Sequence, residues 1–528
     1  MAKIVFIGDS LTQGFQSGAI TKTLWSYPAI IARSFGLNPV TTPTGDKTDF
    51  LVPDFSGANG LPVNLEAILR SMSFAGRSLD FIDLPFAFAA AMRELSFTEQ
   101  YWETGPGNKD SQTGPIHHNL AVWGYSVADS YQMTEALSRR IIQGIRQKVD
   151  FDPVAAGARD RTTRRTQNPQ FLAKYAELTQ LDLVEELAKE EPVENLLFWL
   201  GANNVLGVAF SLDLIWSQSA DVHKLPQQRS CNIWTVEHFA LLWREVEKRL
   251  NKLRHEGKVK NVLVATIPDV TIPPVTRGVS PNALKVQYWI RQQNPRASQE
   301  QLKVLFEADP EAAERSADGL YEYYTHFWIQ DKDFAADPSA HPQLTLDEAR
   351  QIRTIIDGYN KVIEDSAKAN NYVFIDLAKK FNGYAFRRQA KSDPFPQPFL
   401  GALETNPATN HRVKRRVDEN GIEVVEVQYD TRFLGTVIDK NGDKVPRGGF
   451  FALDGVHPTT TGYGVVAYHI LEAMQAAGIQ GANPANLNWD EIVANDTLLC
   501  SPPPLLEDIV SFLGHVDPIA RRLVKALS

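Results

Sequence analysis

The segment Lys3-Ile4-Val5-Phe6-Ile7-Gly8-Asp9-Ser10-Leu11 begins the chain with an apolar run that stops at a glycine and two polar residues. The run 3–7 does not alternate between apolar and polar side chains, which is typical of a strand covered on both faces of its sheet. Gly8 permits a sharp turn of the backbone. The segment therefore predicts a buried strand that brings Ser10 to the carboxyl edge of a parallel sheet, where α/β proteins place their ligands.

Further apolar runs of this kind follow long amphipathic helical patterns. The runs are 196–200, 261–267 and 372–377, and the helical patterns are 171–190, 236–255 and 346–370. A repeated order of helix and then strand implies parallel strands joined by right-handed crossovers. We therefore predict an α/β fold, a three-layer α/β/α sandwich with a mainly parallel sheet.

Segments near 41–115, 270–345 and 385–448 interrupt this pattern. The first two are rich in aromatic residues. The third contains Asn420-Gly421 and Asn441-Gly442 between β-type runs, a pattern that favours hairpins. We interpret all three as insertions into one domain that covers 1–480. Residues 481–528 are expected to form a C-terminal helical tail, which ends in an amphipathic helix near 505–527.

The composition is that of a globular protein, with 43% hydrophobic and 22% charged residues in 528. A net charge of −9 argues against a nucleic-acid partner, which needs a basic face. The basic run 159–165 is the main local exception, and we interpret it as a solvated loop. Cys231 and Cys500 form no CxxC pair and have no metal-ligand spacing, which favours a reducing compartment and a cytoplasmic location.

Two apolar stretches are candidates for a signal peptide or a membrane-spanning segment. The run 4–7 is too short for the apolar part of a signal peptide. The stretch 196–216 is longer, but Asn203, Asn204 and Asp213 make its insertion into a bilayer costly. We therefore expect no integral membrane segment.

The candidate chemistry lies in short motifs that are far apart in the sequence. A serine hydroxyl such as that of Ser10 needs a base, and histidine has a suitable pKa near neutrality. In Asp454-Gly455-Val456-His457-Pro458, a carboxylate three residues before the histidine can lie on the same turn and orient the imidazole. The Asn203 amide and the Gly124 N–H are candidate donors to an oxyanion. Taken singly, each motif also fits an ordinary cap or turn.

Four of these motifs together resemble the conserved blocks of the GDSL, or SGNH, hydrolase family. Gly8-Asp9-Ser10-Leu11, followed by Thr12, Gly14 and Ser26-Tyr27-Pro28, is similar to the first block. Asn119 to Gly124 is similar to the second block, Gly201 to Asn203 to the third, and Asp454 to Pro458 to the fifth. The four occur in the family's order. The third block usually ends in Asp, and here Asn204 stands in that place.

The resemblance implies a flavodoxin-like serine esterase or lipase that needs no cofactor and no metal. Ser10 would be the nucleophile, His457 the general base and Asp454 its orienting carboxylate. The N–H groups of Ser10 and Gly124 and the side chain of Asn203 would form the oxyanion hole. The substrate would be a small-molecule or lipid-like ester.

Other interpretations stay open. On the same scaffold the chain is also compatible with a carbohydrate acetylesterase, an acyltransferase or a non-catalytic binding protein. The aromatic insertions either form a lid over an apolar acyl site or pack onto the core. The sequence has no GxSxG, Walker A, GxGxxG or HExxH motif, and we interpret His117-His118 as part of a loop. The acyl-chain length and the oligomeric state are not determined by the sequence.

Overall fold

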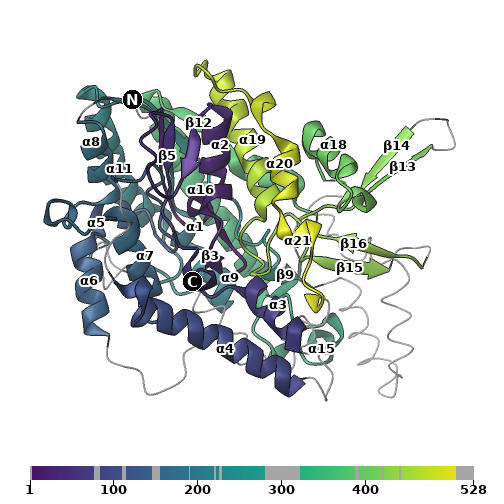
Figure 1. Ribbon diagram of the computed structural model, residues 1–528. Helices are drawn as coiled ribbons and strands as arrows, with labels where there is room; N and C mark the ends of the chain where they lie inside the picture. Colours follow the sequence, from purple (N-terminus) through teal and green to yellow (C-terminus); the bar gives the residue numbers. More distant parts are fainter. Residues whose placement is uncertain are drawn as a thin grey trace.

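A parallel sheet forms the centre of the computed structural model (Figure 1). The structure describes residues 3–75, 84–109, 115–145, 155–189, 191–218, 222–224, 229–279, 321–386, 392–417, 421, 423–438 and 442–506. The sheet has four strands in the order β1-β7-β8-β12, and each strand is parallel to its neighbours. They are β1 (Ile4–Gly8), β7 (Val193–Trp199), β8 (Val259–Ala265) and β12 (Val373–Ile375). The predicted α/β class with a parallel sheet is confirmed.

The segment around Asn119 runs parallel to the free edge of β1. Phe6 N donates to His118 O over 2.9 Å, and Leu120 N donates to Phe6 O over the same distance. Val122 N then donates to Gly8 O over 3.1 Å. These bonds carry the segment toward the end of β1 at which Ser10 lies.

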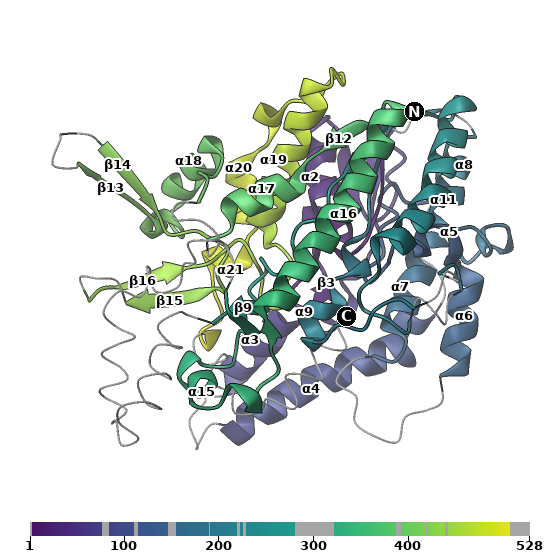
Figure 2. The same ribbon diagram turned by 180° about the vertical axis from the view of Figure 1, so that it is seen from behind.

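Alternate residues of the central strands point into two different hydrophobic cores. One core contains Val5 and Ile7 of β1, and the other contains Ile4 and Phe6. The first core includes side chains of α8 (Gln180–Leu187), α11 (Val236–His255) and α16 (Leu346–Asn370). The second includes side chains of α2 (Tyr27–Ser34), α17 (Leu377–Tyr384) and α19 (Thr460–Ala476). Figure 2, seen from behind, shows α16 along the face that points away from the viewer in Figure 1. The sheet is therefore covered on both faces, as the continuous apolar strands predict.

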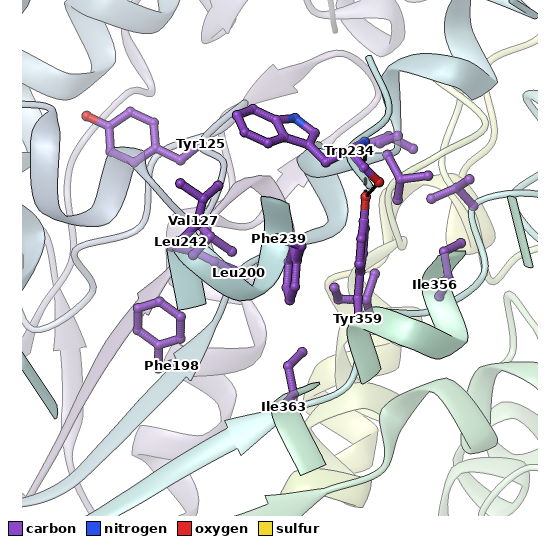
Figure 3. Close-up of a cluster of buried hydrophobic side chains, with 14 of the residues drawn as sticks. Tyr125, Val127, Phe198, Leu200, Trp234, Phe239, Leu242, Ile356, Tyr359 and Ile363 are labelled. Carbon is purple, nitrogen blue, oxygen red and sulfur yellow. Dashed lines mark hydrogen bonds between the residues drawn. The ribbon is translucent and has the colours of Figure 1, made fainter. Parts of the chain in front are cut away.

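Aromatic stacking joins α11 to α16 in the first core (Figure 3). The Tyr359 ring lies 4.1 Å from the Phe239 ring, with 13° between their planes. The Tyr359 hydroxyl donates to Trp234 O and accepts from Trp234 N. The buried polar atom is thus fully paired inside an apolar cluster.

The helices predicted over 236–255 and 346–370 are confirmed with the same bounds. Thr345 and Glu348 form a capping box at the start of α16. The prediction over 171–190 is wrong in its first half, where only a short 3-10 turn forms and the helix α8 begins at Gln180. There the side chain of Asn168 binds both the N–H and the C=O of Leu172, which replaces helical hydrogen bonds.

The described parts of the insertions contain additional helices and small antiparallel sheets. The helices are α3 (Leu65–Ala75) and α4 (Leu84–Glu103). One sheet has the order β11 (Leu344–Thr345), β10 (Tyr323–His326), β9 (Thr276–Gly278). The hairpins are β13 (Val413–Val417) with β14 (Glu423–Val427) and β15 (Gly435–Ile438) with β16 (Lys444–Arg447). The two predicted hairpins are confirmed, and both project from the body (Figure 1). Asn420 and Asn441 lie outside the described residues, as does most of the helix predicted near 505–527. The earlier part of the tail packs on the second core through α20 (Trp489–Ala494) and α21 (Thr497–Cys500).

The prediction of a solvated loop for the basic run 159–165 is wrong. These residues lie in α7 (Ala158–Gln167), and Arg161, Thr162 and Thr163 are buried. Arg161 Nη1 donates to Trp102 O over 2.7 Å. The helix lacks an apolar stripe because its buried face is hydrogen-bonded rather than hydrophobic, so hydrophobic periodicity gives no signal for it.

Candidate active site

The predicted nucleophile begins α1 (Ser10–Gln13) at the end of β1. Asp9 caps this short helix, since its carboxylate accepts from Leu11 N over 3.1 Å. As the first helical residue, Ser10 has a backbone N–H with no partner within the helix. A Cβ on Gly8 would lie 2.0 Å from Thr12 Oγ1, so only glycine fits at the end of the strand. Ser10 is 5% exposed.

Asp454 and His457 form a buried pair on the loop before α19. His457 Nδ1 lies 3.1 Å from Asp454 Oδ2, and Asp454 Oδ1 accepts from the N–H groups of Val456 and His457 over 2.9 and 2.8 Å. Burial opposes the ionisation of this carboxyl. The adjacent His457 and these hydrogen bonds outweigh burial and hold the pKa of Asp454 below its ordinary value. The carboxylate is therefore suited to orient and charge-stabilise the imidazole.

The hairpin that follows α1 holds this pair from the other side. It consists of β2 (Phe15–Gln16) and β3 (Ala19–Ile20) with a tight turn between them. Gly18 N donates to Asp454 Oδ2 over 2.8 Å, so the same oxygen faces both Gly18 and His457. The ring of Phe15 lies 4.5 Å from the His457 ring. The start of the chain thus fixes both members of the pair.

Asn203 links the Ser10 loop to the loop that carries Gly124. It follows β7 in a 3-10 turn, and its Nδ2 donates to Asp9 Oδ2 over 3.2 Å and to Tyr125 O over 2.9 Å. Burial raises the pKa of Asp9 to about 7, while the Leu11 N–H and the charge of nearby His457 act in the opposite direction. Asp9 is therefore an acidic group that titrates near neutrality within the site.

Gly124 has a φ of +72°, a backbone conformation that favours glycine. Its N–H group has no acceptor within the described part of the chain. The preceding N–H, that of Trp123, donates to Gln13 Oε1 over 2.9 Å. The Gly124 N–H is thus available to an external acceptor.

The structure pairs Asp454 with His457 and connects the loops that carry Ser10, Gly124 and Asn203, but the connecting bonds are made by the neighbours Asp9, Gln13, Gly18, Trp123 and Tyr125. Where the chain is described, the Ser10 hydroxyl has no hydrogen bond to the His457 ring. Such bonds are often long before substrate binds, and they tighten in the reacting complex.

The departure from the family's third block is accommodated locally. Asn204 is buried and its Oδ1 accepts from Val127 N over 3.1 Å, while its Nδ2 has no partner among the residues described. An aspartate would offer the same acceptor. The amide therefore keeps this contact of the side chain but adds an unpaired donor.

The paired histidines hold backbone groups instead of facing one another as ligands. His117 Nδ1 lies 3.0 Å from Thr166 O, and His118 Nδ1 accepts from Leu51 N over 2.9 Å. Burial lowers the pKa of each to about 4. Within the described ranges, no group of three or more His, Cys, Asp or Glu side chains is arranged to hold a metal ion.

Sequence motifs did not reveal Gln13 or the threonines of α7, which support the loop around Gly124. Gln13 lies within the first block but at a position that the resemblance does not use, and the threonines of α7 lie outside the blocks and have no apolar period.

Comparison with known proteins adds no relative: no protein-family model, no curated protein and no solved structure matches this chain.

Proposed function

We propose that this protein is a serine hydrolase of the GDSL/SGNH type that cleaves carboxylic esters through an acyl-enzyme. The observation that carries the proposal is the buried Asp454–His457 pair, which contacts Phe15 and Gly18 of the hairpin that directly follows the Ser10 helix. A serine hydroxyl at a strand end, a histidine and a buried carboxylate are the components that activate a serine nucleophile.

In the proposed reaction, Ser10 Oγ attacks the ester carbonyl carbon while His457 Nε2 takes the hydroxyl proton. The oxyanion accepts hydrogen bonds from the N–H groups of Ser10 and Gly124 and from Asn203 Nδ2. His457 then gives the proton to the departing alcohol. A water molecule, deprotonated by the same histidine, releases the carboxylic acid from Ser10.

Asn203 must exchange a partner in this mechanism. Both hydrogens of its amide already have acceptors, Asp9 Oδ2 and Tyr125 O. The contact to Asp9 is the longer of the two, at 3.2 Å, and is the one that an oxyanion would replace.

The proposal also includes the architecture and location inferred from the sequence. The two cores on opposite faces of the sheet support a three-layer α/β/α sandwich, in one domain over 1–480. Cys231 and Cys500 form no CxxC pair and have no metal-ligand spacing, which supports a cytoplasmic location. No helix in the described ranges is both long enough and apolar enough to cross a bilayer.

The test is the Ser10→Ala variant. We expect its kcat for ester hydrolysis to fall by about 10⁴-fold or more, because the attacking oxygen is removed while the oxyanion hole remains. Hydrolysis of p-nitrophenyl acetate and labelling by a fluorophosphonate are the measurements. Ser339→Ala is the matched control, since this exposed serine bonds, among the residues that the structure describes, to Asp337 alone, and its replacement should leave both signals unchanged. Wild-type hydrolysis by Ser10→Ala would refute the assignment, and a wild-type chain that does not label would favour a non-catalytic binding protein.

Aromatic side chains next to the site support an apolar acyl group. Phe15 and Trp123, which adjoin His457 and Gly124, share an apolar cluster with Phe55 and Trp102. In a series of p-nitrophenyl esters, kcat/KM should therefore be highest for an acyl chain longer than that of acetate. A maximum at acetate would favour the carbohydrate acetylesterase, and capture of the acyl group by added alcohols would favour an acyltransferase.

A further inference from the structure

Helix α7 carries a buried face of threonines, unusual for a helix in a protein interior. Thr162, Thr163 and Thr166 are all fully buried. The hydroxyls of Thr162 and Thr163 donate to the carbonyl oxygens four residues earlier, over 3.0 and 3.1 Å. Their oxygens are thus left free to accept hydrogen bonds from other parts of the chain.

Those hydrogen bonds come from the two residues that flank Gly124. Trp123 Nε1 donates to Thr162 Oγ1 over 3.0 Å, and the Tyr125 hydroxyl lies 2.9 Å from Thr163 Oγ1. Both rings are buried, so each bond is made away from water, where an unpaired partner is costly. Helix α7 therefore holds the side chains on both sides of Gly124.

Gln13 connects this support to the helix of the nucleophile. It lies three residues after Ser10 on α1 and is fully buried. Its Oε1 accepts from Trp123 N over 2.9 Å, and its Nε2 lies 3.5 Å from Thr166 Oγ1. One side chain thus touches the nucleophile helix, the Gly124 loop and α7.

We infer that Gln13 is a positioning residue that sets the Gly124 N–H relative to Ser10, with α7 as the rigid support. The N–H that Gln13 holds immediately precedes that of Gly124, and the Gly124 N–H lies in the peptide plane whose direction the backbone of Trp123 sets. Without the Gln13 bond, the backbone at Trp123 is free to rotate and the Gly124 N–H loses its direction. This inference rests on the proposed function, in which Gly124 donates to the oxyanion.

The test compares Gln13→Met with Gln16→Met. Methionine keeps the length of the side chain and removes its hydrogen bonds. Gln16 is also buried, and its side-chain amide donates a hydrogen bond to Thr460 Oγ1 over 3.4 Å. Among the described residues, its side chain has no hydrogen bond to the Gly124 loop. The two variants therefore match in chemistry and burial, but Gln16→Met acts on the hairpin beside the Asp454–His457 pair, whereas Gln13→Met acts on the Gly124 loop.

Amide hydrogen exchange is the first measurement. Gln13→Met should accelerate exchange of the Trp123 amide by about 10-fold or more relative to the wild type, because the acceptor of this amide is lost. Gln16→Met should leave that amide unchanged. Unchanged protection of Trp123 in Gln13→Met would overturn the inference, and this measurement does not depend on ester hydrolysis.

The second measurement compares an ester with the matching thionoester, in which sulfur replaces the carbonyl oxygen. Sulfur accepts hydrogen bonds weakly, so the preference for oxygen reports on the oxyanion hole. Gln13→Met should reduce this preference by about 10-fold and lower kcat with little change in KM. Gln16→Met should keep the wild-type preference. An unchanged preference in Gln13→Met would overturn the positioning role. A wild-type chain that cleaves no ester would instead refute the proposed function. In that case the exchange result alone would decide whether Gln13 anchors the loop.

Discussion

The buried carboxyl of Asp9 makes the stability of this protein depend on pH around neutrality. Burial raises its pKa to about 7, against about 4 in an unfolded chain. Between these values the native state binds more protons than the unfolded state. The contribution of Asp9 to the free energy of unfolding therefore falls as pH rises from 4 to 7.

Asp9→Asn removes this titration. Relative to the wild type, the variant should become more stable as pH rises from 5 to 8, by on the order of 3 kcal/mol for a carboxyl with so large a shift. Denaturant unfolding at both pH values measures the difference.

Asp454→Asn should show the opposite sign. Its pKa is lowered, so its contribution to the free energy of unfolding is present above the unfolded pKa and is lost as pH falls.

For Asp9→Asn, a stability difference from the wild type that is independent of pH would contradict the burial of an ionisable Asp9.

At the scale of residues, the sequence predicts the groups with characteristic chemistry. Ser10, Asp454 and His457 are recognisable through the four motifs that occur together in the family's order, since each motif taken singly also fits a cap or a turn. Gln13 is not recognisable, because a glutamine that orients a backbone amide across the fold has no local pattern. Its role depends on contacts at a separation of 110 residues.

Among the elements, the β2–β3 turn gives a direct test of how Asp454 is held. Gly18 has a φ of +82°, and alanine in the left-handed region costs about 1–2 kcal/mol. Gly18→Ala should therefore lower stability. It should also lower kcat by about 10-fold, because the displaced N–H no longer binds the Asp454 carboxylate.

Gly36→Ala is the control for this strain. Gly36 has a φ of +74°, and a Cβ there would meet nothing within 4 Å. The same loss of stability is expected, with kcat unchanged. Equal kcat values in the two variants would show that the Gly18 N–H has no part in positioning Asp454.

Elements with a hydrophobic stripe are the ones that the sequence predicts well. The helices α11 and α16 combine such a stripe with threonine caps, and both were predicted with the observed bounds. Helix α7 was missed because its buried side is held by hydroxyls and guanidinium groups instead of apolar contacts. The first half of 171–190 was wrongly predicted as helix, since Leu172 and Tyr175 keep the helical spacing while Asn168 ties the backbone into a turn.

At the scale of the whole molecule, the β13–β14 hairpin projects from the body. Its removal tests whether this part of the third insertion can be separated from the domain. Val413 and Val427 are paired across its base, and Arg412 fixes that base through Gln428 O and Gly448 O. The outer part is exposed, and Val417 is 67% exposed.

Replacement of residues 414–426 by Asn-Gly should leave the free energy of unfolding within about 0.5 kcal/mol and kcat/KM for short esters unchanged, since the described residues of this segment are exposed or half-buried and their ion pairs face solvent. Thermal unfolding and p-nitrophenyl acetate hydrolysis are the measurements. Loss of cooperative unfolding would instead make the hairpin part of the domain core.

The bond from Gly18 to Asp454 spans 436 residues, and this separation has a consequence for synthesis on the ribosome. Ser10, the proposed nucleophile, leaves the exit tunnel long before His457, its proposed base. At about 5–20 residues per second, roughly 20–90 s pass between the two events. In the proposed mechanism the serine would therefore stay without its base during this interval, and its activation would have to wait until the Asp454–His457 loop docks onto the β2–β3 hairpin.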